Sequence, residues 1–329
     1  MRRTNAAQAV PVAPAERRSC GFATLYRKEL ADHFHSARFK LVLLLLTLAG
    51  LASLFGALEA VSDANASSSE YVILALYTLS SNSIPSFASF LAYLAPLAGL
   101  ALGFDAINRE RAQGTLNRLV SQPIYRDAII NAKFLAGVTV IFLMIFFVGI
   151  LAGALGLLVV GIPPEAEELL RIGAYLLLTV VYTSMWLGLS MLCSVLCRHA
   201  ATSALIVIAL WIYLTLFASM VVSVIANLAY PLDGIMGFYN AMDNYQLQLT
   251  LERASPYYLY CEAASTLLNP NIRTVGITTQ ASMSGALASY LTFDQSLLLI
   301  WPHLTCMVAL VLFAFTCSYV LFMRQEIRA

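Results

Sequence analysis

The stretch Phe134–Gly161, FLAGVTVIFLMIFFVGILAGALGLLVVG, contains no charged side chain. The hydrocarbon core of a bilayer is about 30 Å thick, and a helix needs roughly 20 predominantly apolar residues to cross it. The apolar residues here do not alternate with the period of two that is typical of a barrel strand. The stretch therefore predicts a membrane-spanning α-helix.

Five other stretches have a similar length and hydropathy. With the first one, they cover approximately residues 41–60, 84–104, 134–161, 173–197, 203–228 and 297–323. The chain of 329 residues is 60% hydrophobic and only 11% charged, whereas a soluble domain is about 25% charged. In lipid, only helices and closed barrels satisfy every backbone polar group. We therefore predict an all-α polytopic membrane protein with six transmembrane helices.

Basic residues lie almost entirely on one side of the predicted membrane. With the N-terminus inside, all but Arg171, Arg253 and Arg273 of the 19 lysines and arginines fall in the N-terminal tail or near the loops after the second, fourth and sixth spans. Basic residues are retained on the cytosolic side of membrane proteins. Both termini are therefore expected to be cytosolic, and residues 1–21, which have no apolar core, are expected to form a disordered cytosolic tail.

The charged segment 105–133 lies between the second and third predicted spans, on the cytosolic side. Leu116, Leu119 and Val120 recur at helical spacing among charged residues, and Pro123 ends or kinks the helix because proline cannot donate the next helical hydrogen bond. A solvated loop that only fixes topology would explain the charges. The apolar ridge suits a helix that docks in a groove of another protein.

Thirteen residues in and just after this segment form a motif. They are Glu110, Arg111, Gly114, Thr115, Leu116, Leu119, Ser121, Pro123, Ile124, Arg126, Ile129, Lys133 and Phe134. In this order and spacing they resemble the cytosolic signature of the type 2 ABC transporter permeases, in the subgroup of the nitrous-oxide-reductase maturation, gliding-motility and sodium-export permeases. The resemblance extends more loosely over residues 22–329. Ala132 departs from it, because a glycine is expected before the lysine.

The resemblance implies a fold, an activity and a set of partners. It implies that the chain is the membrane-spanning permease subunit of an ATP-driven transporter, an exporter in the plasma (inner) membrane of a prokaryote. A separate ABC ATPase subunit would bind ATP and Mg²⁺, so the chain itself would not be an enzyme. A second permease, either another copy or a related chain, would pair with this one through the spans.

The resemblance also implies which residues meet the ATPase. Segment 105–133 would be the coupling segment, with Arg109–Gln122 as a coupling helix seated on the ATPase. The contact residues would be Arg109, Glu110, Arg111, Gly114, Thr115, Leu116, Arg118 and Leu119. Within this set, Glu110 and Arg118 would make polar contacts, and Leu116 and Leu119 would form the ridge that enters the groove of the ATPase.

Residues 22–40 form a second amphipathic segment. Apolar residues share one helical face, and most charged residues lie opposite them. The apolar face comprises Phe22, Leu25, Tyr26, Leu30, Phe34 and Ala37. A helix of this kind lies in the plane of the membrane interface. The family resemblance implies the same, since its members carry an elbow helix ahead of the first span.

Residues 229–296, between the last two predicted spans, are too long and too polar to be a turn. Ser255 followed by Pro256 predicts the start of a helix that Asn269 and Pro270 end. Residues 235–252 also show helical spacing. These helices could be interfacial, with tyrosines at headgroup depth. They could instead form an outer cap or gate over the transport path, or a dock for an external partner.

The sequence lacks the common motifs for nucleotide binding and hydrolytic catalysis. It contains no GxxxxGK[ST] motif to hold ATP phosphates, and no HExxH or GxSxG motif. Its six cysteines are scattered. We therefore expect no catalytic residue, cofactor or metal in this chain, and lipid and protein subunits but no nucleic acid as partners. A multi-pass membrane enzyme and a non-transporting membrane scaffold remain as alternatives.

Overall fold

The computed structural model describes residues 17–63, 72–81, 83–114, 125–270 and 291–324. Within these ranges the chain is helical apart from short connections, and none of it is β-strand. The helices in chain order are α1 (Arg17–His35), α2 (Ala37–Asp63), α3 (Val72–Thr78), α4 (Phe87–Gly103), α5 (Asn108–Ala112), α7 (Arg126–Val160), α8 (Ala166–Leu196), α9 (Ala200–Ile212), the π-helix η1 (Tyr213–Phe217), α10 (Ala218–Ala229), α11 (Gly234–Glu252), α12 (Pro256–Leu268) and α14 (Phe293–Arg324).

The six predicted spans are confirmed. Among the described residues, six helices are long and apolar enough to cross a membrane, namely α2, α4 with α5, α7, α8, the continuous α9–η1–α10, and α14. The third begins at Arg126, well before the apolar run that predicted it. The helix includes the polar turns before Phe134 because Lys133 finds carboxylate partners inside the protein.

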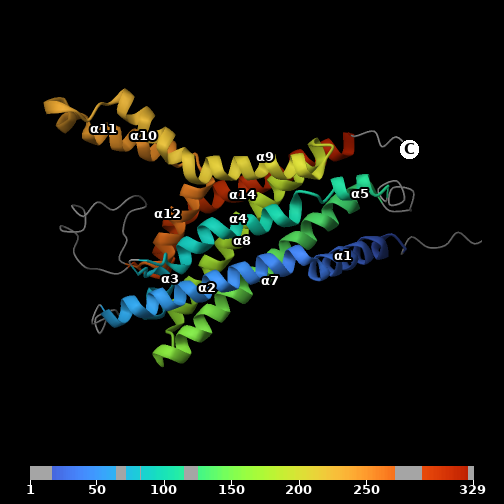
Figure 1. Ribbon diagram of the computed structural model, residues 1–329, viewed down its shortest axis with the longest axis horizontal. Coiled ribbons are helices and arrows are strands. Elements are labelled where there is room, and N and C mark those ends of the chain that lie inside the picture. The colour runs from blue at the N-terminus through green and yellow to red at the C-terminus, as the bar shows by residue number, and fades with distance from the viewer. Residues whose placement is uncertain (1–16, 64–71, 82, 115–124, 271–290, 325–329) are drawn as a thin grey trace, which may run out of the picture.

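Helix α1 lies beside the first part of α7, at the end of the bundle where α5 is found (Figure 1). The Tyr26 hydroxyl donates to Thr139 Oγ1 of α7 at 2.9 Å, and Leu25 is buried. The helix stops at His35, and Ser36 Oγ accepts the Phe39 N–H at 3.2 Å to start α2. The predicted single segment 22–40 is therefore divided between two helices.

The start of α1 also differs from the sequence prediction. The helix begins at Arg17, so residues 17–21 of the predicted tail are helical, and residues 1–16 lie outside the described ranges. A helix that is already held by packing extends by a further turn at little cost, since nucleation is the expensive step.

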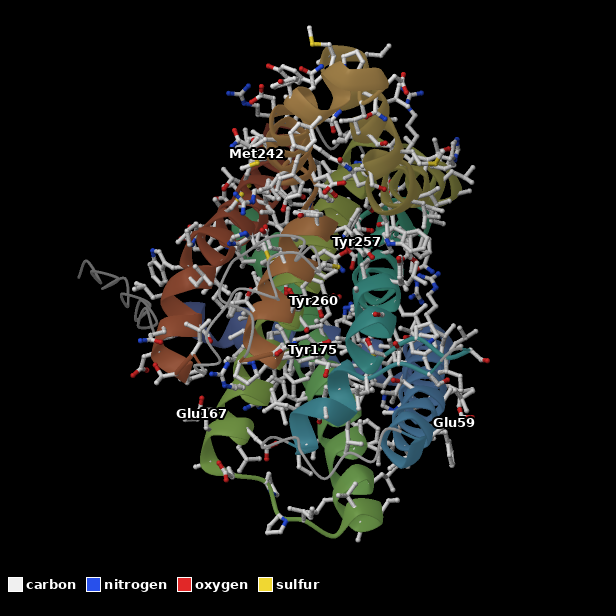
Figure 2. The ribbon with its side chains drawn as sticks, turned by 90° about the vertical axis from the view of Figure 1, so that its left-hand side faces the viewer. Glu59, Glu167, Tyr175, Met242, Tyr257 and Tyr260 are labelled. Carbon is white, nitrogen blue, oxygen red and sulfur yellow. The ribbon has the colours of Figure 1, made fainter. Side chains whose placement is uncertain are left out.

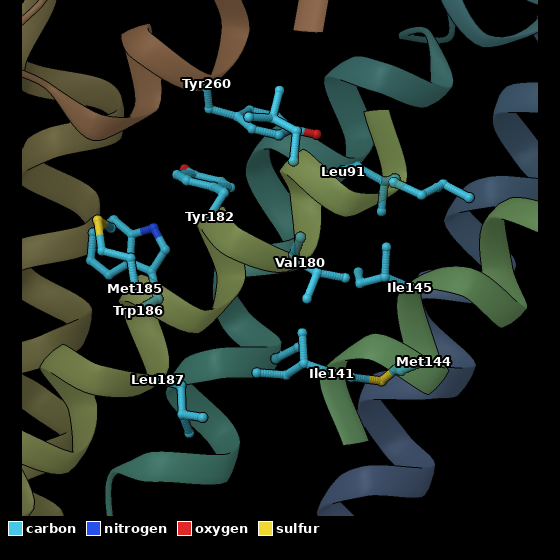
Figure 3. Packing of buried hydrophobic residues seen from close by; sticks show 14 of the residues in the cluster. Leu91, Ile141, Met144, Ile145, Val180, Tyr182, Met185, Trp186, Leu187 and Tyr260 are labelled. Atoms are coloured by element: carbon cyan, nitrogen blue, oxygen red, sulfur yellow. The ribbon is translucent and has the colours of Figure 1, made fainter. Parts of the chain in front are cut away.

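Helix α8 runs through the middle of the bundle and packs against α4, α7, α12 and α14. Its Tyr182 and Trp186 are fully buried (Figure 3). Close packing against α4 depends on Gly99, because a Cβ there would lie 2.5 Å from the Thr183 carbonyl oxygen. Small residues let membrane helices approach closely in this way.

Two helices predicted in the outer segment 229–296 are present as α11 and α12, but α12 is not at the surface. It packs against α8 and α14, and Tyr260 is completely buried. The Tyr260 ring stacks on Tyr182 with centroids 4.4 Å apart (Figure 3), and its hydroxyl lies 2.9 Å from Thr179 Oγ1. The hydroxyl of Tyr260 is therefore satisfied inside the protein rather than by headgroups, whereas Tyr257 and Tyr258 of the same helix are partly exposed.

Helices α10 and α11 form a hairpin that projects from the bundle at the end far from α1 (Figure 1). Asn244 of α11 closes it, because its Nδ2 donates to Asn227 Oδ1 at 3.0 Å and to the Tyr230 carbonyl at 2.8 Å. Residues 271–290 of the outer segment lie outside the described ranges.

Candidate partner-binding site

Lys133, in the first part of α7, is the centre of a buried ion-pair cluster. Its Nζ lies 2.9 Å from Glu29 Oε2 of α1 and 2.7 Å from Glu110 Oε1 of α5. The three side chains are only 7 to 10% exposed. One ammonium group therefore joins the amphipathic N-terminal helix, the charged segment after the second span, and the third span.

The chain places Glu110 there through the backbone that precedes α5. Ser194, near the end of α8, accepts the N–H groups of Ile107 and Asn108 at 3.1 and 3.2 Å. These would otherwise be unsatisfied donors at a helix start. Helix α5 ends at Ala112, and Gly114, just after the cap residue Gln113, has a φ of +67°, a left-handed conformation that favours glycine.

A second ion pair lies next to the first. Arg38 at the start of α2 pairs with Asp105 in the turn before α5, and its guanidinium also lies 4.7 Å from the centre of the Phe104 ring. Asp105 is buried, whereas Arg38 is about half exposed. The pair ties the first span to the same short segment that carries Glu110.

Electrostatic interactions in the cluster stabilise the ionised form of Glu29, the carboxyl group that α1 contributes. Burial alone would raise the pKa of the Glu29 carboxyl, but the ammonium groups of Lys133 and Lys28 outweigh burial and hold that pKa below its usual value. Lys28 Nζ lies 3.1 Å from Glu29 Oε1. Glu29 is therefore a carboxylate whose two oxygens each form an ion pair, one with Lys28 and the other with Lys133.

A cavity of about 810 Å³ opens beside the cluster. Its polar lining comes from α1, the turn between α4 and α5, α5 itself and α7, and includes Lys28, Asp32, Asp105, Arg109, Glu110 and Lys133. Both signs of charge are present in similar numbers. The lining is therefore strongly polar and close to neutral overall, which does not suit an apolar ligand.

The predicted contact residues divide into three groups. Arg109 and Gly114 are exposed, and Arg111 is half buried with an Nη1 that lies 3.5 Å from the Cys197 carbonyl oxygen. Glu110 points inward to Lys133 and is buried. The other four, Thr115, Leu116, Arg118 and Leu119, lie outside the described residues.

Glu29, Asp105 and Ser194 were not among the predicted site residues. Their positions in the chain are 104, 28 and 61 residues away from Lys133. No local pattern can pair charges at such separations, because helical periodicity reports only neighbours three or four positions apart. One available signal was Lys133, a lysine immediately before a long apolar helix; the other was the family resemblance, whose matching positions include Glu29 and Asp105.

A profile of the family described as ABC-2 family transporter protein matches residues 23–327 of the chain. The matched range contains most of α1, the six candidate spans and the whole cluster around Lys133. A search of curated proteins finds no match to the chain.

Proposed function

The chain belongs to the ABC-2 transporter family, and we propose that its segment 105–133 couples it to a separate ATPase subunit that drives export. The family match and the six apolar helices make it a multi-pass membrane permease subunit. The ATPase partner, the direction of transport and the arrangement of subunits are the proposed part.

The ion pairs of Lys133 are the observation that carries the proposal. Breaking a buried ion pair by removing one partner costs about 3–5 kcal/mol. Because Lys133 holds both Glu110 and Glu29, α5 is expected to move together with α1 and α7 rather than separately from them. A push on α5 would then reach the third span and the N-terminal helix directly.

Residues in the segment take different roles in this mechanism. The exposed Arg109 and Gly114, together with Arg111, Thr115, Leu116, Arg118 and Leu119, form the contact with the ATPase. Glu110 transmits the push, because its carboxylate is engaged inside the protein. This assignment replaces the polar contact to the ATPase that the sequence alone suggested for Glu110.

The remaining parts of the proposal follow from the family and the charge distribution. Two permeases, either copies or related chains, pair through the spans in the plasma (inner) membrane of a prokaryote, with both termini cytosolic. ATP and Mg²⁺ bind the ATPase partner. The end of the bundle with α1 and α5 then faces the cytosol, and the α10–α11 hairpin faces outward (Figure 1).

Co-purification tests the proposal. Tagged chain should bring down an ATPase subunit, and Leu116→Asp should weaken this association. Lys133→Met should keep the association but reduce ATP-driven transport. The ATPase would still push on α5, but without the ion pairs of Lys133 the movement would not reach α7 and α1. Asp243→Asn, a charge removal at an exposed site on α11, is the matched control and should change neither.

Two results would contradict the proposal. One is normal association and transport in both Leu116→Asp and Lys133→Met, each correctly inserted. The other is full activity of the chain with an ATPase whose own catalytic site has been disabled, which is the behaviour of a membrane scaffold.

A further inference from the structure

A second cavity, of about 250 Å³, lies apart from the cluster around Lys133, where the fifth span passes into the α10–α11 hairpin. It is formed between the bent part of the fifth span, η1 and α10, and the connection from α11 to α12. Tyr257 of α12, labelled in Figure 2, is one of the residues that line it. None of the residues discussed for coupling belongs to this cavity.

The π-helix η1 shapes one wall. The Ala218 N–H donates to the Tyr213 carbonyl, five residues back, so the regular bonding of the span is interrupted here. Ser255, at the start of α12, donates its hydroxyl to the Leu214 carbonyl at 2.9 Å and holds the interrupted turn against α12. Single π-turns within α-helices occur frequently at functional sites.

Two polar side chains in this lining are buried without full hydrogen bonding. Glu252 is 7% exposed, and no described residue hydrogen-bonds its Oε2; Gln248 Nε2 lies 3.4 Å from its Oε1. Thr215 is 6% exposed, and its hydroxyl has no hydrogen-bond partner among the described residues. A buried polar atom without a partner costs about 1–3 kcal/mol. The cavity therefore offers a carboxylate and a hydroxyl to an occupant.

The charges around Glu252 identify the sign of that occupant. The neighbouring Arg253 is turned to Glu262, with Nη2 2.8 Å from Oε1, and His303 lies 2.7 Å from the other oxygen of Glu262. Glu262 is thus satisfied, whereas Glu252 is not paired with a cation from any part of the chain that the structure describes. Burial, together with the nearby Glu262 carboxylate, raises the pKa of Glu252 despite the hydrogen bond from Gln248. A bound cation would offset the free-energy cost of burying the charged form of this carboxylate.

The rest of the lining suits an apolar body. Tyr213, Tyr257 and Tyr258 come from both sides of the cavity, and valine, isoleucine and leucine side chains complete it. The negative face of an aromatic ring attracts cations, and its large apolar area also packs against apolar groups. A carboxylate beside several tyrosines is therefore a favourable environment for an ammonium group on an organic body.

We propose that this cavity binds a small organic ammonium compound, with its nitrogen at Glu252 and Thr215 and its apolar body among the tyrosines. An anion would meet the carboxylate of Glu252, and a neutral compound would leave that carboxylate without a counter-charge. The site does not depend on the ATPase coupling proposed above, because none of its residues contributes to the cluster around Lys133.

Equilibrium dialysis with radiolabelled 2-phenylethylamine tests the proposal. The full chain, with any subunit that co-purifies, is placed in nanodiscs of phosphatidylcholine, and empty nanodiscs give the background from partitioning into lipid. We expect saturable binding with one site per chain. Unlabelled 2-phenylethylamine should compete for it, whereas 2-phenylethanol and 3-phenylpropionate should compete at least about tenfold less well.

Variants separate the charge from the shape of the site. Glu252→Gln should weaken binding at least about tenfold, and Ala218→Phe, which places a ring where Ala218 lines the cavity, should abolish it. Asp243→Asn removes a carboxylate from an exposed position of the same helix as Glu252 and should bind normally. Each variant is first checked for an unchanged elution volume and for an unfolding temperature no lower than that of the original chain.

Three results would overturn the proposal. They are binding no higher than in empty nanodiscs, undiminished binding by folded Glu252→Gln or Ala218→Phe, and equal competition by 2-phenylethanol. Dialysis needs neither ATP nor transport. A failure of ATPase coupling would therefore leave the binding result unchanged, and the two proposals can fail separately.

Discussion

Replacing Lys133 by methionine is the most direct perturbation of the structure. Methionine keeps the unbranched shape and most of the length of the side chain, and it removes the ammonium group that lies 2.9 Å from Glu29 and 2.7 Å from Glu110. Two buried carboxylates then lose their shared cation. Glu29 keeps Lys28 at 3.1 Å as a partial substitute, so most of the effect is expected at Glu110.

The expected loss follows from the burial of these groups. Removing one member of a buried ion pair costs about 3–5 kcal/mol because it leaves an uncompensated charge. We expect the lower end, about 3 kcal/mol, since Lys28 still serves Glu29. At about 2–4 °C per kcal/mol, the unfolding temperature should fall by roughly 6–12 °C.

Thermal unfolding in nanodiscs near neutral pH measures this change, with Asp243→Asn as the control that should leave the unfolding temperature unaltered. The double variant Lys133→Met with Glu110→Gln removes the negative charge of Glu110 as well and should recover part of the lost stability. The coupling free energy between Lys133 and Glu110 is then the change in the free energy of unfolding in the double variant minus the sum of the changes in the two single variants. A single variant as stable as the original chain, or a double variant no better than the single, would refute the reasoning.

Three further predictions concern other parts of the molecule. The pKa of Glu29 is lowered in the folded chain, so its stabilisation is present above the unfolded value of 4.5 and is lost as the pH falls through the folded value; the difference in unfolding temperature between the original chain and Glu29→Gln should therefore disappear in acid. The pKa of Glu252 is raised, so the charged carboxylate destabilises the folded chain as the pH rises above 4.5; Glu252→Gln should be more stable near neutral pH and equal in acid, and a constant difference would contradict this. Gly99→Ala should lower the free energy of unfolding by about 1–3 kcal/mol through overpacking, because the added Cβ would lie 2.5 Å from the α8 backbone. Gly173→Ala is the control, since a Cβ there meets nothing within 4 Å. It should be neutral or stabilising in the same unfolding assay.

The spans were predictable because a single physical requirement determines them. A run of apolar residues as long as Phe134–Gly161 has few alternatives to a membrane helix, whatever its neighbours are. The boundaries were less predictable, since the third span continues back to Arg126 through residues that are polar in sequence but paired in space. The start of α12 was predictable from Ser255 and Pro256, because helix caps are local signals.

The environment of each helix could not be read from the sequence. Tyr260 looks like a tyrosine of the membrane interface, and only its contacts with Tyr182 and Thr179 reveal that α12 lies inside the bundle. Glu110 similarly looks like a surface residue of a charged helix. Its burial depends on Lys133 and Glu29, which come from two other helices. Residues whose roles are set by distant partners are the ones that periodicity misses.

Helix α8 contacts both the segment ahead of α5 and helix α12, whose first turn lines the proposed cavity. Near its last turn, Ser194 holds the backbone ahead of α5, and at its first turns Arg171 donates to the Leu267 carbonyl of α12 and to Ser296 Oγ of α14, both at 3.1 Å. A helix rises about 1.5 Å per residue, so these contacts are roughly 35 Å apart along one uninterrupted helix. Arg171 is fully buried, and its hydrogen bonds would have to break for α12 to slide along α8. A displacement received at α5 is therefore expected to reach α12 as a tilt of the whole of α8, which moves one wall of the cavity at Glu252 relative to the fifth span.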